Sequence, residues 1–278
     1  MPRVLLEVPT QQEAELASTN DELPLWAAPF GLKLLATVEM RAGMTVLDVG
    51  SGTGSPLLEL AQRLGETSRT YGVDLWRHGN RGVREEARFH NIANVEIVEA
   101  QAERLPFRDG SFDLIVSDNG ISNVQDLEAA LRECGRVTRS GGQMVFTMNL
   151  PETMKEFHFI YADIFSSLGL GYQISRMHEH ILEQRLSVGL VSEKVESAGF
   201  RIHGAAEDAF KMRFATGTAP MNYSFIRLFF MERWKGIVKE EERKKIFDHL
   251  ERNLNAHTDR LGSLDLTIPY VCFDSRKS

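Results

Sequence analysis

Two patterns of apolar residues alternate along the chain between residues 45 and 149. Short runs of β-branched and apolar residues predict strands, and the segments between them repeat apolar residues at the spacing of one helix face. The expected strands are Thr45–Val49, Thr70–Asp74, Val95–Glu99, Phe112–Ser117 and Gly142–Met148. Strands that alternate with helices are typical of a parallel sheet with crossover helices. This stretch therefore predicts an α/β fold.

The same patterns extend the sheet beyond residue 150. Pro151–Arg185 is helical and aromatic in pattern, and the predicted helix Ser187–Ala198 leads to a strand at Phe200–Ala206. Asn222–Leu261 forms a second helical block, followed by a closing strand at Leu264–Asp274. With these two strands, the expected fold is Rossmann-like: a seven-stranded, mostly parallel sheet sandwiched by helices, with helical lid insertions.

These patterns divide the chain into three parts. Residues 1–40 are expected to form an N-terminal cap segment, and residues 41–150 the Rossmann-like core. Residues 151–278 are expected to supply the helical insertions or lids and the last strands of the same domain.

A glycine-rich loop follows the first predicted strand and opens a helix. Gly50, Gly52 and Gly54 stand two residues apart, and glycine lets a ligand approach the backbone closely. A dinucleotide fingerprint would place its third glycine where this chain has Ser55. Asp48, at the end of the strand, also suits a cationic ligand better than a pyrophosphate. The loop is thus an imperfect match to the NAD-binding pattern.

A second carboxylate ends the next predicted strand. Asp74 lies 24 residues after Gly50, about the spacing at which an acidic residue reaches ribose hydroxyls in nucleotide-binding α/β folds. A carboxylate accepts hydrogen bonds from both hydroxyls at once. Asp74 is therefore a candidate ribose ligand.

At this point the chain resembles class I S-adenosylmethionine methyltransferases, in the group that includes the ubiquinone and menaquinone C-methyltransferases. Four stretches, in order, carry the resemblance: Val46–Gly54, Gly72–Leu75, Gln101–Phe107 with Ser111–Asp113, and Leu131–Glu133 through Arg136 to Gly142. They span roughly residues 45 to 150. The resemblance makes residues 41–150 the S-adenosylmethionine-binding core.

The resemblance implies that Asp48 and the glycine loop hold the methionine part of the cofactor, and that Asp74 holds the ribose. Leu75 would pack on the adenine ring, and the Ala102 amide would meet the ring edge. Gln101 stands where the family often has Asp, and Glu103 is the alternative acceptor for the adenine amino group. The expected cofactor-binding set is Asp48, Gly50, Ser51, Gly52, Gly54, Asp74, Leu75, Gln101, Ala102, Glu103, Ser117, Asp118 and Asn119.

The implied function is methyl transfer from S-adenosylmethionine, leaving S-adenosylhomocysteine, to an O, N or C nucleophile of a small molecule. An NAD(P)-dependent oxidoreductase and a non-catalytic S-adenosylmethionine-binding or scaffold protein are the alternatives. Ser122 and Asn123 replace a His pair frequent in the family, so a His base is absent there. No catalytic residue is assigned; the polar candidates are Asp118, His158, Tyr172, His178, Arg213 and Tyr223.

Composition and charge limit the kinds of partner expected for this chain. The 32 Lys and Arg residues stand against 39 Asp and Glu residues, a net charge of −7, which argues against a nucleic-acid partner. No apolar run approaches the ~18 residues of a membrane span, and the start of the chain lacks a secretory signal pattern, so a cytoplasmic location is expected.

Two further expectations concern metals and assembly. His178 and His180 are two residues apart and would not share a face of a helix, so no metal site is predicted. The aromatic C-terminal helices, with Phe225, Phe229 and Phe230, are a candidate homodimer surface.

Overall fold

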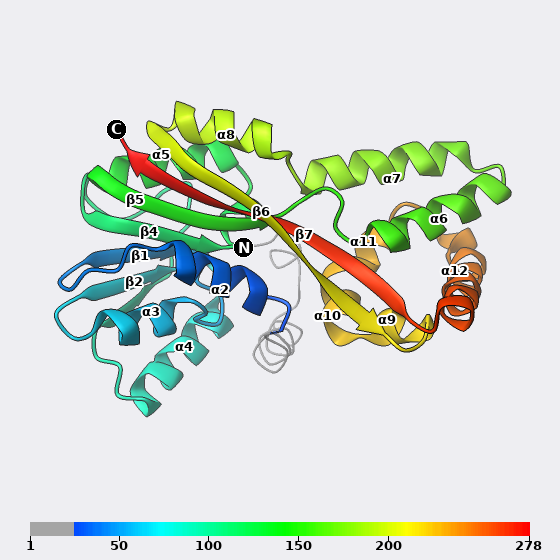
Figure 1. Cartoon of the computed structure of the whole chain (residues 1–278), viewed down its shortest axis with the longest axis horizontal. Coiled ribbons are helices and arrows are strands. Elements are labelled where there is room, and N and C mark those ends of the chain that lie inside the picture. Colours follow the sequence, from blue (N-terminus) through cyan, green and yellow to red (C-terminus); the bar gives the residue numbers. More distant parts are fainter. Residues whose placement is uncertain (1–24) are drawn as a thin grey trace. The chain divides into compact units, whose positions relative to one another are not determined.

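The computed structural model describes residues 25–278, and its centre is one seven-stranded sheet of order β3-β2-β1-β4-β5-β7-β6 (Figure 1). The strands are β1 Thr45–Val49, β2 Arg69–Val73, β3 Val95–Val98, β4 Phe112–Asp118, β5 Thr138–Asn149, β6 Phe200–Phe214 and β7 Leu264–Lys277. Strands β1, β2, β3, β4 and β5 pair with their neighbours in parallel. The arrows of β6 and β7, by contrast, point in opposite directions. The predicted α/β fold with a seven-stranded, mostly parallel sheet is confirmed.

Five longer helices accompany the sheet: α2 Ala28–Thr37, α3 Leu57–Leu64, α4 Arg77–Phe89, α5 Leu127–Val137 and α8 Val188–Ser197. One core cluster joins α2 and α3 to β4 through Leu34, Leu60 and Leu114. A second joins α3 and α4 to β3 through Leu57, Val83 and Ile97. These apolar contacts hold the helices that follow β1 and β2 against the sheet, and thereby position the loops that begin them.

The strand order reverses at β1, which pairs with β2 on one side and β4 on the other. In open parallel sheets a ligand binds beyond the carboxyl ends of the strands at such a reversal. The loops after β1, β2 and β4 are therefore the ones that position a site.

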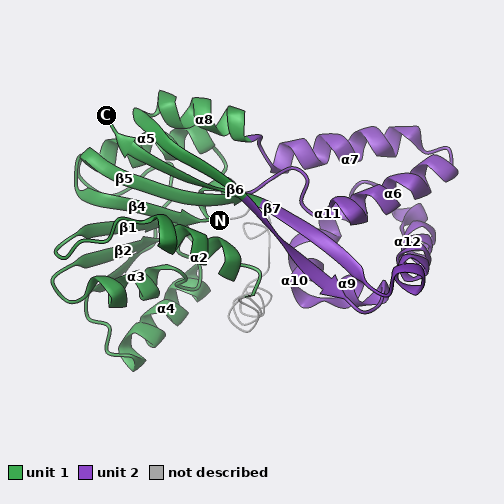
Figure 2. Cartoon of the chain, in the orientation of Figure 1, with its two compact units in different colours: residues 1–148, 188–207, 270–278 green, residues 149–187, 208–269 purple. Residues whose placement is uncertain are grey.

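The chain forms two compact units (Figure 2). Of the described residues, unit 1 comprises those up to Met148, Val188–Glu207 and Tyr270–Ser278, and unit 2 comprises Asn149–Ser187 and Asp208–Pro269. The helices of unit 2 are α6 Lys155–Ser167, α7 Gly171–Gln184, α9 Thr218–Asn222, α10 Ser224–Ile226, the π-helical turn η3 Arg227–Met231, α11 Glu232–Lys235 and α12 Glu240–Leu261. No helix within residues 25–278 combines the length and the apolar character needed to cross a membrane.

Several boundaries differ from those expected. Strand β5 begins at Thr138 rather than Gly142, and β6 continues to Phe214 rather than ending at Ala206. Both extensions are polar or exposed for most of their length, so hydrophobic pattern alone did not mark them. The first 24 residues of the expected N-terminal cap lie outside the described residues.

Candidate functional site

The backbone of the glycine loop between β1 and α3 lies directly against the backbone of another loop. Gly50, Gly52 and Gly54 have φ values of 78°, 52° and 106°, which favour glycine. A Cβ atom on Gly50 would lie 2.6 Å from the Gly120 Cα atom, in the loop after β4. The loops after β1 and β4 therefore meet at a distance that only glycine permits.

Ser117 links the end of β1 to the loop after β4 through two hydrogen bonds. Its hydroxyl donates to the Val49 carbonyl at 2.6 Å and accepts from the Ile121 amide at 2.8 Å. Since the side chain is buried and makes both bonds within the protein, its observed contacts are those of a positioning residue.

Asp74, just beyond β2, is held by the backbone around it. One carboxylate oxygen accepts from the Gly52 amide at 2.9 Å and the other from the Trp76 amide at 2.8 Å. Asn80 donates its side-chain amide to the Asp74 carbonyl at 2.9 Å. The carboxylate is thus fixed in orientation, while each oxygen retains a lone pair for a further donor.

Asp48 and Asp118, unlike Asp74, have carboxylate oxygens without a hydrogen-bond partner. Asp48 is fully buried, and neither of its carboxylate oxygens has a hydrogen-bond partner. Burial raises its pKa well above the usual range, and the nearby Asp118 and Asp74 carboxylates raise it further. At Asp118, burial raises the pKa to about 7, although Thr147 donates to one oxygen at 2.6 Å and opposes the shift. Buried carboxylates gathered without a cation suit a positively charged ligand.

Orphaned polar atoms concentrate around these loops. Within the described chain, the buried side-chain N and O atoms without a hydrogen-bond partner belong to Asp48, Ser51, Trp76, Asn80, Asp118 and Asn119. Buried polar groups are nearly always satisfied in folded proteins. Their concentration beyond β1, β2 and β4 marks a place where a polar ligand would complete the hydrogen bonding.

A cavity of about 200 Å³ opens beside this cluster. Its lining consists of Gly50, Val73, Asp74, Leu75, Ala100, Gln101, Ala102, Glu103, Gly120, Val124, Gln125 and Asp126. Glu103 accepts from the Gln125 and Asp126 amides at 2.9 and 3.2 Å, whereas the Gln101 side chain is exposed. One oxygen of the Glu103 carboxylate, Oε1, therefore binds the loop before α5.

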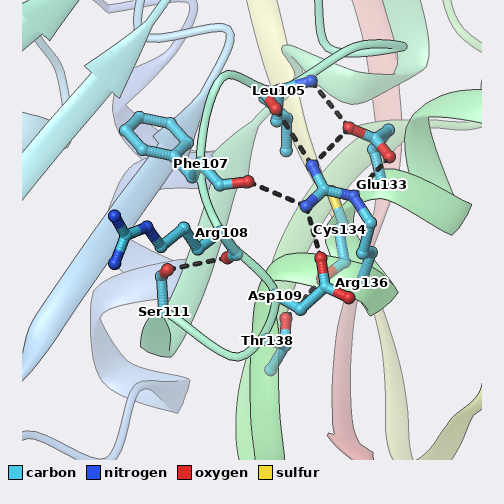
Figure 3. Close-up of polar contacts among 9 residues, drawn as sticks. All are labelled: Leu105, Phe107, Arg108, Asp109, Ser111, Glu133, Cys134, Arg136 and Thr138. Carbon is cyan, nitrogen blue, oxygen red and sulfur yellow. Dashed lines mark hydrogen bonds and ion pairs between the residues drawn. The ribbon is translucent and has the colours of Figure 1, made fainter.

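Arg136 in α5 anchors the segment that follows these lining residues (Figure 3). Its guanidinium donates to the carbonyls of Phe107 and Leu105 at 2.8 and 3.0 Å and pairs with Asp109 at 2.8 Å. Glu133 binds the same guanidinium at 2.7 Å and accepts from the Leu105 amide at 2.8 Å; the Arg136 hydrogen bond is the largest cause of its lowered pKa. The sequence motif contained both residues, but their role depends on the tertiary contact and was not predicted.

The structure thus gathers most of the expected cofactor-binding residues in unit 1. Of the polar candidates, Asp118 lies there, whereas His158, Tyr172, His178, Arg213 and Tyr223 belong to unit 2. Tyr172 is 72% exposed, and Arg213 is an exposed partner of Asp265 at 2.7 Å. No group of three or more potential metal ligands occurs among residues 25–278.

Comparison with known proteins agrees with this geometry. Residues 47–146 match a family model described as "Methyltransferase domain". The ubiquinone/menaquinone biosynthesis C-methyltransferase UbiE of Klebsiella pneumoniae is 41% identical over 107 residues, covering 38% of this chain and 43% of that protein. The demethylmenaquinone methyltransferase of Staphylococcus aureus is 32% identical over 130 residues, covering 47% and 53%. The chain spans about half the length of these curated relatives.

Solved structures extend the likeness to the fold of nearly the whole chain. A putative methyltransferase from Bacillus halodurans superposes with a TM-score of 0.58 at 18% identity, covering 89% of this chain and 98% of that one. The YcgJ protein of Bacillus subtilis gives a TM-score of 0.56 at 17% identity, covering 89% and 97%. At these identities the likeness establishes the fold.

Proposed function

We propose that this chain, in which residues 47–146 match a family model described as "Methyltransferase domain", is a class I S-adenosylmethionine-dependent methyltransferase that transfers a methyl group to an O, N or C nucleophile of a small molecule. The observation that carries the proposal is the cluster of partnerless buried polar atoms around the glycine loop, with Asp48 fully buried among them. A ligand with a sulfonium and an ammonium group would supply the missing positive charge.

The proposed arrangement assigns each part of the donor to one loop. Asp48 and the Gly50–Gly54 loop, with Ser51, would hold the methionine part, and Asp74 would accept from the ribose hydroxyls. Leu75 and the Ala102 amide would contact adenine. Gln101, or Glu103 as the alternative, would accept from the adenine amino group; Glu103 already uses one oxygen, Oε1, to accept from two backbone amides.

When bound, S-adenosylmethionine supplies an electrophilic methyl group and leaves as S-adenosylhomocysteine. The protein's part is then to orient the donor, exclude water and align the acceptor, which supplies much of the catalysis for such a transfer. Asp118 is the last residue of β4 and Asn119 follows it, and each keeps one buried oxygen without a partner. We assign them to contact with the donor or acceptor, and Ser117 to positioning their loop.

Calorimetric titration of the purified protein with S-adenosylmethionine, S-adenosylhomocysteine and NAD tests the proposal. We expect both sulfur nucleosides to bind and NAD not to bind. Asp74→Ala should weaken binding by about 100-fold, because it removes hydrogen bonds to a charged acceptor. Glu66→Ala, an exposed acidic residue of the same unit, is the matched control. Folded protein that binds neither nucleoside would exclude this function.

The proposal extends to location and assembly. We infer that the enzyme is cytoplasmic without a nucleic-acid partner, and that its C-terminal helices form a homodimer. Cell fractionation checks the location. Light scattering checks the assembly, and a mass of one chain at all concentrations would contradict the dimer.

A further inference from the structure

Arg185, directly after α7, is a buried guanidinium without a counter-charge. It is 9% exposed, and no side chain or carbonyl within residues 25–278 accepts a hydrogen bond from its guanidinium or pairs with it. Burial and, to a lesser extent, the neighbouring Arg233 together lower its pKa to about 10. Buried arginines are usually paired. The Arg185 nitrogens are not among the fully buried partnerless atoms of the described chain, so they retain contact with solvent and a ligand could reach them.

The charged group that acts on Arg185 is another cation, Arg233. His158 in α6 is 7% exposed, and its pKa is lowered to about 3, first by burial and then by Arg185, His180 and His178. At neutral pH the imidazole is therefore uncharged and carries one N–H donor. Glu183, on α7, is the acidic residue that acts on His180. All these groups lie within unit 2.

Aromatic rings complete the environment. The Phe230 ring lies 5.7 Å from the Arg185 guanidinium, and the Trp234 ring meets His158 edge-on at 6.1 Å between centroids. A ring under a guanidinium gives a cation–π contact, which offsets only part of the cost of burying the charge. It also leaves the N–H groups at the guanidinium edge available. The fork of donors at that edge matches a carboxylate or a phosphate.

We propose that Arg185 and His158 of unit 2 bind an oxyanion group, a carboxylate or a phosphate, of a small organic ligand. Anion binding follows from the Arg185 guanidinium, which lies against the Phe230 ring and has no hydrogen-bond acceptor within residues 25–278. The ligand is then a small organic acid or a phosphate ester.

Three probes of similar shape distinguish binding of a carboxylate, of a phosphate and of a neutral group. Benzoate, phenyl phosphate and the neutral benzamide are each titrated into the full chain at constant ionic strength, with thermal unfolding and calorimetry as measurements. We expect one or both anions to bind and to raise the thermal midpoint, and benzamide to bind at least about 10-fold more weakly because it lacks the charge. Preference for benzoate indicates a carboxylic acid, and preference for phenyl phosphate a phosphate ester. Equal binding of all three, or no effect of either anion, overturns the proposal.

The variant Arg185→Met separates a binding role from a structural one. We expect the midpoint of the ligand-free protein to stay the same or rise, since an uncompensated buried charge is removed, while stabilisation by the anions is lost. Arg213→Met, at an exposed and paired arginine of the same unit, should retain the wild-type response. A fall of several degrees in the midpoint of Arg185→Met would show a structural partner and overturn the proposal.

A third measurement uses the wild-type protein alone. Phenylglyoxal modifies accessible arginines, and peptide mass spectrometry reports each site separately. We expect the anions to protect Arg185 but not Arg213, and modification of Arg185 that is unaffected by them would count against the site. S-adenosylmethionine affinity should be unchanged in Arg185→Met, so that failure of the anion site and failure of the donor site are observed independently.

Discussion

Unit 1 buries carboxylates and unit 2 buries a guanidinium, and within the described residues neither unit supplies the opposite charge. In unit 1, Asp48 has two partnerless oxygens and Asp118 has one. In unit 2, the Arg185 guanidinium has no hydrogen-bond acceptor or ion-pair partner among the described residues. A protein that needed these charges only for its own stability would pair them. The comparison therefore indicates two binding sites of opposite preference, one for a cation and one for an anion.

The two clusters also differ in how they are built. The unit 1 cluster depends on backbone contact, since Gly50 meets Gly120 and Asp74 is held by two amides. The unit 2 cluster consists of side chains, in which Arg185 lies over Phe230 and His158 meets Trp234. A backbone-built site is sensitive to one added methyl group, whereas a side-chain-built site tolerates replacement of a single member.

The largest expected effect is on the pH dependence of stability at Asp118. Its pKa of about 7 in the folded protein lies above its ordinary value of 3.8. As pH rises from about 4 to about 7, the unfolded chain therefore gives up a proton that the folded protein keeps, and stability falls. We expect Asp118→Asn to abolish this fall, which makes the variant more stable than wild type at pH 8 by a free energy of unfolding on the order of 4 kcal/mol. Asparagine retains an oxygen to accept from Thr147.

Urea unfolding at pH 4.5 and pH 8 measures this difference. Glu66→Gln makes the same change of charge at an exposed position and should leave the pH dependence unaltered. If Asp118→Asn is equally destabilised at both pH values, the carboxylate has a favourable partner, and the contrast with unit 2 disappears.

A smaller effect is expected where α4 meets the glycine loop. A Cβ atom on Gly79 would lie 2.6 Å from the Gly52 carbonyl oxygen, whereas a Cβ atom on Gly82, in the same helix, would meet nothing within 4 Å. Gly79→Ala should cost roughly 1–3 kcal/mol of unfolding free energy through overpacking and weaken S-adenosylmethionine binding. Gly82→Ala should stabilise the protein by roughly 0.5–1 kcal/mol. Chemical denaturation checks both, and equal effects would show that the loop yields to the added methyl group.

Sequence alone predicted the parts of the site that are encoded locally. The glycine spacing and the strand ends indicated Asp48 and Asp74, because a strand end and the loop after it are neighbours in the chain. The function of Arg136 could not be predicted, since it depends on carbonyls of a distant loop. Arg185 is the clearest case: an arginine at the end of a helix is ordinarily interpreted as a solvated charge that favours the helix dipole, and only the structure shows that it is buried beside the Phe230 ring.

The smallest expected effect is the change that Arg185→Met makes to the titration of His158, a group that responds to pH in the sense opposite to Asp118. Its pKa of about 3 lies below the ordinary 6.5, so stability falls as pH decreases from about 6.5, because the unfolded chain takes up a proton that the folded protein refuses. Arg185→Met removes one of the lesser causes of the lowered His158 pKa. In an NMR titration, protonation of His158 should therefore begin at higher pH, and the shift should correspond to a free energy on the order of 1 kcal/mol. The pKa should remain below 6.5, because burial is the largest cause and persists. An unchanged titration would mean that Arg185 does not act on His158, and the two residues could not then share one anion.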